Sequence, residues 1–327
     1  MGTVKLLKRI GLAFGLVLGL LNTGLAQSPY PNKPVRLIIP YSPGGATDQF
    51  ARVVADNLSK RLGQPVIVEA KPGAGGTIAA DFVAKSAPDG YTVLVADVGP
   101  NAIAAGLYPK LPYDPIKDFA PISLAVHSPL MLVTNAELPF RTVGDIVKYG
   151  KANPSKLNYA SSGNGNISHL AGELFAYQAG IPLQHVPYKG SQAGLLDTIT
   201  GQVQMTIVTV ASGLPHVNSG KLRAIAAAGS ERSPLLPSMP TFKESGLPNY
   251  DVSSWGGFVA PAGTPREIVT RLNQEIVAIL KQDDVKERLT TAGFVAAPST
   301  PSEFSDLIRS EVDKWKRAVK DTNAKVD

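Results

Sequence analysis

Short apolar runs rich in β-branched residues alternate along this chain with longer segments in which apolar residues recur at helical spacing. Residues 35–39 and 66–68 are such runs, and each is followed by a glycine-containing loop and then by a segment whose apolar residues stand three or four positions apart. The same order returns after residue 127. Strand, loop and helix repeated in this way favour an α/β fold in which mainly parallel sheets are flanked by helices.

The repetition occurs in two sets, so we expect two lobes. The chain is expected to cross between the lobes near 121–125 and again near 224–228. Lobe 1 would then be discontinuous and consist of residues 27–124 plus 227–327, and lobe 2 would be 125–226. A small ligand is expected between the lobes, because pockets favour such interfaces. Hinge closure around the ligand is the usual motion of this design.

The N-terminus has the three-part pattern of a secretory signal peptide. Three basic residues precede the uncharged run 10–21, and small residues follow at Gly24 and Ala26. A membrane anchor is the alternative, but a spanning helix needs about 20 apolar residues and this run ends at Asn22. We expect residues 1–26 to be removed and the mature protein to be periplasmic.

Charge and composition exclude several classes of function. The formal charge of +6 comes from 32 basic and 26 acidic residues. Three of the basic residues lie within 1–26, so the remaining chain carries 29 minus 26, or +3. The basic residues are dispersed, which argues against a nucleic-acid partner. The absence of cysteine excludes thiolate nucleophiles and Cys-ligated metals.

The loop at 40–48 joins the first expected strand to the first expected helix. Gly44 and Gly45 permit positive φ and close backbone approach, and a helix start offers free N–H groups and a partial positive charge to an anion. Asp48 is expected to cap the helix. The alternative is that the two glycines only form a tight turn.

A second loop of the same kind lies at 161–169, again between an expected strand and helix. Its hydroxyls, amides and glycine N–H groups suit a carboxylate, directly or through water. The alternative is an Asn-Gly turn followed by Ser168 as a helix cap. One loop in each lobe would hold a single anion from two sides, and neither loop contains Lys or Arg. Lys189 is expected on a solvated helix start.

Enzyme and cofactor motifs are not matched. The glycines at 73–76 and 163–165 lack the third glycine of the dinucleotide fingerprint, and the chain has neither a P-loop nor a nucleophile elbow. The four histidines lack metal-ligand spacing. We therefore expect a binding protein without cofactor or metal. Two alternatives stay open: a sensor that presents its ligand to a signalling partner, and a hydrolase with Ser42 or Ser162 as nucleophile and His169 as base.

Seven ordered motifs resemble one family. The chain is similar over its whole mature length to the Bug-type (TctC-like) extracytoplasmic solute-binding proteins of tripartite tricarboxylate transporters. The motifs lie at 40–48, 72–76, 87–92, 111–115, 169–175, 186–190 and 260–265. Two positions depart from the usual family pattern: Gln204 stands where Asp is frequent, and 97–101 replaces a run of glycine, hydroxyl and histidine residues.

The resemblance implies a two-lobed periplasmic-binding-protein fold, type II-like, whose loops hold a carboxylate with the help of ordered water. It also implies that the other end of the ligand meets the loop at 98–101 and the segment around 208–209. Delivery of the ligand to the membrane permease subunits of the transporter follows from it, and we expect a monomer. The predicted ligand-binding residues are Tyr41, Ser42, Gly44, Gly45, Ala46, Thr47, Asp48, Gly99, Asn101, Ser161, Ser162, Gly163, Gly165, Asn166, His169, Val208 and Thr209.

Overall fold

The computed structural model describes residues 30–325, and the unit that holds both sheets begins at Lys33. The predicted signal peptide at 1–26 lies outside the described residues. Across the described part of the chain, every helix is too short or too polar to cross a membrane.

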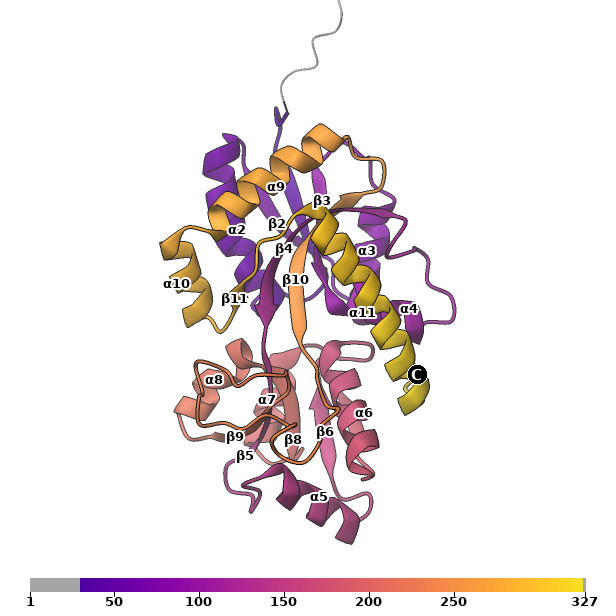
Figure 1. Ribbon diagram of the computed structural model, residues 1–327, viewed down its shortest axis with the longest axis vertical. Helices are drawn as coiled ribbons and strands as arrows, with labels where there is room; N and C mark the ends of the chain where they lie inside the picture. Colours follow the sequence, from indigo (N-terminus) through magenta and orange to yellow (C-terminus); the bar gives the residue numbers. More distant parts are fainter. Residues whose placement is uncertain (1–29, 326–327) are drawn as a thin grey trace, which may run out of the picture. The chain divides into compact units, whose positions relative to one another are not determined.

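Two sheets organise this unit (Figure 1). The first sheet has six strands, and β1 pairs in parallel with β2 and β3, whereas β10 runs antiparallel to both β3 and β4. Buried side chains of β1 and β3, such as Ile38 and Leu94, fill its core. The strands in spatial order are β11 (Val295–Ala296), β4 (Phe119–Ser128), β10 (Ser254–Pro261), β3 (Thr92–Asp97), β1 (Val35–Ile39) and β2 (Val66–Ala70).

The second sheet has five strands, with β6 parallel to its neighbours β7 and β8 and β5 antiparallel to β8 and β9. The order is β7 (Gln184–Pro187), β6 (Asn158–Ser161), β8 (Met205–Thr209), β5 (Leu130–Asn135) and β9 (Leu222–Ala227). The two-lobed α/β fold is thus confirmed. Both sheets are mixed, however, because the strands by which the chain leaves and returns, β4 with β10 and β5 with β9, run in opposite directions.

Helices flank both sheets (Figure 1). Beside the six-stranded sheet lie α2 (Ala46–Leu62), the short turn η1 (Ala74–Gly76), α3 (Thr77–Ala84), the π-helical turn η2 (Gly99–Ile103), α4 (Ala104–Leu107), α9 (Arg266–Leu280), α10 (Asp283–Thr291) and α11 (Pro301–Thr322). Around the five-stranded sheet lie α5 (Val143–Ala152), α6 (Ile167–Ala179), α7 (Ser191–Ile199) and α8 (Val210–Asn218).

The chain passes from the first sheet to the second at Pro129, between β4 and β5. We expected this crossing near 121–125, but β4 pairs with β10 all the way from Phe119 to Ser128. Pro121 resembles a strand break in the sequence, yet it stands beside a register shift of the β4–β10 pair, where a proline is tolerated.

The return passage uses the long segment 228–253. This segment stays bonded to the end of β9: Phe242 N donates to Ala227 O and Val252 N donates to Ala228 O. The expected return near 224–228 therefore coincides with the end of β9, and the chain reaches β10 only at Ser254. The lobe limits at 124/125 and 226/227 stay a prediction.

Helix α11 is the longest helix described and lies against elements of both lobes. It begins with a capping box in which Thr300 and Glu303 bond each other's backbone amides. It packs on η2, α4 and β4 and also contacts α6. Its buried Glu311 accepts hydrogen bonds from the indoles of Trp315, at 3.0 Å, and Trp255, at 3.4 Å. This carboxylate links α11 to β10.

Candidate functional site

A cavity of about 850 Å³ is lined by residues of both lobes. Most of its walls are loops that follow the carboxyl ends of β1, β2, β6, β7 and β8, together with the last residue of β3. Residues beside the two crossings, such as Ser128 and Ser254, complete it. Ligands of open α/β sheets bind outside these strand ends. The cavity is therefore the candidate binding site.

Many predicted site residues line this cavity and others do not. Those that line it are Tyr41, Ser42, Gly45, Ala46, Thr47, Ser162, Gly163, Asn166, Val208 and Thr209. Those that lie outside its lining are Gly44, Asp48, Gly99, Asn101, Ser161, Gly165 and His169. The second group supports the loops from behind, as their hydrogen bonds show.

The start of α2 is open toward the cavity. Its N-cap is Gly45, which supplies no capping side chain, and the next two residues, Ala46 and Thr47, line the cavity. Asp48 is not the cap that we expected. It lies in the first turn, accepts a bond from Gly44 N at 2.9 Å and pairs with Arg52 at 2.8 Å. First-turn N–H groups of a helix have no partner within it, so α2 presents donors and a partial positive charge here.

The loop before α6 differs from this arrangement. Ser162 N donates to Ser168 Oγ at 2.9 Å, Gly163 N to Ser161 Oγ at 3.1 Å, and Gly165 N to His169 Nδ1 at 3.3 Å. The N-cap is Asn166, and Ser168 is not a cap: its amide donates to Asn166 Oδ1. The loop's own side chains thus occupy amides that we expected to meet a ligand. Ser162 still lines the cavity, and its hydroxyl forms no bond among the described residues.

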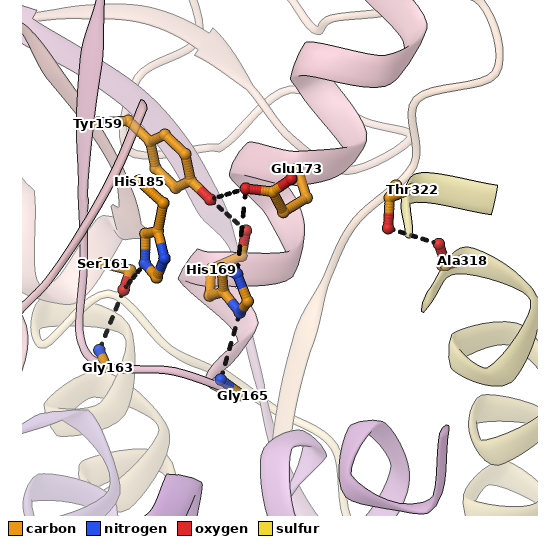
Figure 2. Close-up of polar contacts among 9 residues, drawn as sticks. All are labelled: Tyr159, Ser161, Gly163, Gly165, His169, Glu173, His185, Ala318 and Thr322. Atoms are coloured by element: carbon orange, nitrogen blue, oxygen red, sulfur yellow. Dashed lines mark hydrogen bonds and ion pairs between the residues drawn. The ribbon is translucent and has the colours of Figure 1, made fainter. Parts of the chain in front are cut away.

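A buried polar cluster lies behind this loop (Figure 2). The His185 ring stacks on His169 with ring centres 4.1 Å apart, and its Nε2 lies 2.6 Å from Ser161 Oγ. Burial lowers the pKa of His185 to about 4, so the ring is neutral at physiological pH. The Tyr159 ring also stacks against His185, and its hydroxyl donates to Glu173 at 2.6 Å. The cluster fixes the loop 161–169 in position.

The hydrolase alternative gains no support from these contacts. Among the residues that the structure describes, neither the Ser42 hydroxyl nor the Ser162 hydroxyl is hydrogen-bonded to a histidine. The serine that does meet a histidine is Ser161, which is buried and lies outside the cavity lining.

Asp97, the last residue of β3, is the acidic side chain in the lining, and sequence reasoning did not select it. Its Oδ1 accepts bonds from the Tyr41 hydroxyl at 2.8 Å and from Gly99 N at 3.0 Å. Burial raises the pKa of Asp97 to about 6, although the two hydrogen bonds act to lower it. Gly99 and Asn101, which we expected to meet the ligand, instead hold this residue: Asn101 Oδ1 accepts from Asp97 N at 3.2 Å.

Other lining residues were also missed. Lys189 is exposed just before α7, as expected, but it also lines the cavity, and it has no ion pair within the described part of the chain. Phe50, Tyr108 and Trp255 supply apolar surface. The loop 72–76 follows β2 as 40–48 follows β1, and that equivalence was the signal that could have identified it.

Comparison with known proteins gives a consistent answer. Residues 50–324 match the family model of the tripartite tricarboxylate transporter family receptor. The protein BugT of Bordetella pertussis (strain Tohama I) is 37% identical over 303 residues, which cover 92% of this chain and 93% of BugT.

Two solved structures are also similar. The R. palustris protein Rpa4515 with adipate has a TM-score of 0.87 at 34% identity and covers 91% of this chain and 100% of its own. The periplasmic binding protein BugD has a TM-score of 0.85 at 32% identity, with 90% and 99% covered. A two-lobed fold with a cavity at the strand ends, the family match and these relatives agree: the chain belongs to the tripartite tricarboxylate transporter receptor family of periplasmic solute-binding proteins.

Proposed function

We propose that this protein captures a small carboxylate between its two lobes and delivers it to the membrane permease subunits of a tripartite transporter. The observation that carries the proposal is the start of α2, which opens into the cavity without a capping side chain. A carboxylate there would accept the free first-turn N–H groups and meet the positive end of the helix dipole. The adipate in the Rpa4515 structure is a ligand of this chemical class.

Neutral groups of the lining are sufficient for useful affinity. Ser42 and Thr47 stand beside the α2 start, and Ser162 lies in the other lobe. A hydrogen bond to a charged group contributes about 1.5 to 3 kcal/mol, and micromolar binding corresponds to about 8 kcal/mol. A few such bonds therefore hold a carboxylate without a salt bridge.

The lobes move as two bodies in this proposal. Lobe 1 is formed by the chain before Pro129 and the chain from Ser254 onward. The hinge lies at the two crossings, at Pro129 and just before Ser254. Release into the periplasm after cleavage behind Ala26 places the protein where a permease subunit meets it. The ligand enters while the lobes are apart and is enclosed when they approach.

The test begins with the ligand itself. Mass spectrometry of small molecules released from protein purified under native conditions should identify an organic acid, and calorimetry with that acid should give saturable binding near one per chain. Permease subunits should be retained on the immobilised, ligand-loaded protein. Turnover of the acid, retention of a kinase ectodomain in place of the permease, or a bound ligand without a carboxylate would contradict the proposal.

A further inference from the structure

One charged group in the cavity is unexplained by carboxylate capture. Asp97 is the acidic side chain of the described lining, and only 7% of its surface is exposed. A buried carboxylate next to a bound carboxylate repels it, and like charges close together are costly in a region of low dielectric. The presence of Asp97 therefore restricts which acids fit.

The hydrogen bonds of Asp97 are one-sided. Its Oδ1 takes the bonds from Tyr41 and Gly99, and no described residue donates to Oδ2. Asp97 is in no ion pair within residues 30–325. A buried carboxylate without a cation is costly to ionise until a donor of opposite charge meets it.

Tyr41 joins this group to the proposed anion site. It belongs to the loop that leads into α2, next to Ser42, and its hydroxyl donates to Asp97. The α2 start and Asp97 therefore belong to one continuous wall of lobe 1. One end of this wall suits an anion and the other suits a cation.

We propose that Asp97 selects ligands that carry a protonated amine in addition to the carboxylate, with the carboxylate at the start of α2 and the ammonium at Asp97. The inference rests on the proposed function and narrows its ligand class to amino acids and related amino carboxylates. An ammonium donates to Oδ2 and neutralises the buried charge. A hydroxyl donates but leaves the charge uncompensated, and a methylene does neither.

The experiment compares acids that differ only in one group. Protein freed of endogenous ligand is titrated calorimetrically with succinate, malate and aspartate, and with glutarate, 2-hydroxyglutarate and glutamate. In whichever set binds, we expect the amino acid to bind about tenfold or more tightly than the acid without a substituent.

The matched variants are Asp97→Asn and Asp56→Asn. In Asp97→Asn the amide oxygen of the new side chain retains the bonds from Tyr41 and Gly99 while the charge is lost. Asp56 is an exposed aspartate of α2 outside the cavity lining, so its replacement removes the same charge elsewhere. Asp97→Asn should weaken the amino acid about tenfold and strengthen the unsubstituted acid, whereas Asp56→Asn should change neither.

Each other outcome counts against the inference. An unsubstituted acid that binds as tightly as its amino partner, with Asp97→Asn equal to wild type, overturns the role of Asp97. Tighter binding of the hydroxy acid than of the amino acid contradicts the selection for an ammonium group. If no acid of either set binds folded protein, while the acid released from native protein binds and carries no amine, the inference is overturned and the proposed function stands.

Discussion

Gly44 and Gly45 are neighbours with different roles. Gly44 has a φ of 85°, which favours glycine, whereas Gly45 has a φ of −80° and a ψ of 177°, which any residue adopts. A side chain at either glycine would strain the loop or occupy the place of the anion. The structure separates the two effects. A side chain would strain the backbone at Gly44, whereas at Gly45 it would enter the cavity that this residue lines.

Gly45→Val should therefore abolish binding and leave the fold intact. The nearest heavy atom to an added Cβ is Ser42 O at 3.7 Å, an ordinary contact, so we expect a loss of stability below about 1 kcal/mol. Gly229→Val is the control, since this glycine has open space and lies outside the cavity lining. Calorimetry and urea denaturation measure both effects. Wild-type affinity in Gly45→Val would remove the α2 start from the site.

Asp97 should also make stability depend on pH. Its folded pKa of about 6 exceeds the ordinary value of 3.8, so its favourable contribution is fully present below pH 3.8 and is lost as the pH rises through 6. We therefore compare the free energy of unfolding of Asp97→Asn with that of wild type. The difference in favour of the variant should grow from pH 4 to pH 8 by up to about 3 kcal/mol. Urea denaturation of both proteins at the two pH values measures this gain. A difference that does not vary with pH would show that burial leaves this carboxyl unperturbed.

At the scale of elements, three of the helix starts at the cavity differ in what they present. The starts of α2 and α7, at Gly45 and Gly190, have no side-chain cap, and Lys189 precedes the second of them. The start of α6 is capped by Asn166. Two equivalent loops suggested a symmetric grip on the anion. The structure assigns free donors to one loop and a rigid, internally bonded wall to the other.

Lys189 is exposed, and water and salt therefore screen its charge. Lys189→Ala should weaken binding of the identified acid by less than about 1 kcal/mol, and this loss should shrink further in high salt. Ser162→Ala is the comparison, because it removes a hydroxyl from the cavity lining. Calorimetry at two salt concentrations distinguishes the loss of the Lys189 charge from the loss of the Ser162 hydroxyl. A large, salt-resistant loss in Lys189→Ala, with Ser162→Ala unaffected, would mean that a salt bridge holds the acid.

The elements that the sequence predicted are those with local signals. The strand at 35–39 and the helix that ends before Gly63 are marked by apolar runs and a glycine stop. Strand β4 was missed because Pro121 conceals it and pairing with β10 creates it. Helix α8 was missed because Gly213 and Pro215 are poor helix formers. A Cβ on Gly213 would lie 2.5 Å from Met131 Cε, so the end of this flexible side chain would have to move.

The same distinction applies to the site. The loop 40–48 was predicted because strand, glycine and helix are contiguous in sequence. Asp97 was not, because its role depends on Tyr41, which is 56 positions away in the sequence. Local patterns predict which backbone faces a ligand, and long-range contacts decide which side chain meets it.

For the whole molecule, the lobes touch at the edge of the cavity. A Cβ on Gly75 would lie 3.0 Å from Asn164 O and 3.2 Å from the Tyr108 hydroxyl. Gly75 follows β2, whereas Asn164 follows β6 in the other sheet. The loops 72–76 and 161–169 therefore limit how closely the lobes approach.

Gly75→Ala should hold the lobes slightly apart and weaken binding about three- to tenfold. Gly63→Ala is a matched control, because Gly63 has the same conformation, with φ 66° and ψ 18° against 64° and 18°, but open space around it. Both variants should lose about 1 kcal/mol of stability from backbone strain. Calorimetry with the identified acid then isolates the steric effect. Equal affinities would show that closure does not bring these loops together.

The pairing of Ser128 with Ser254 sets the order in which the strands of the two sheets emerge. The two residues are register partners at the end of the β4–β10 pair, and everything between them belongs to the second lobe and its connections. All five strands of the second sheet are therefore contiguous along the chain and lie between β4 and β10. The first lobe must wait, because β10 lies between β4 and β3 in its sheet. A chain that emerges N-terminus first therefore presents every strand of the second sheet before β10 can complete the middle of the first.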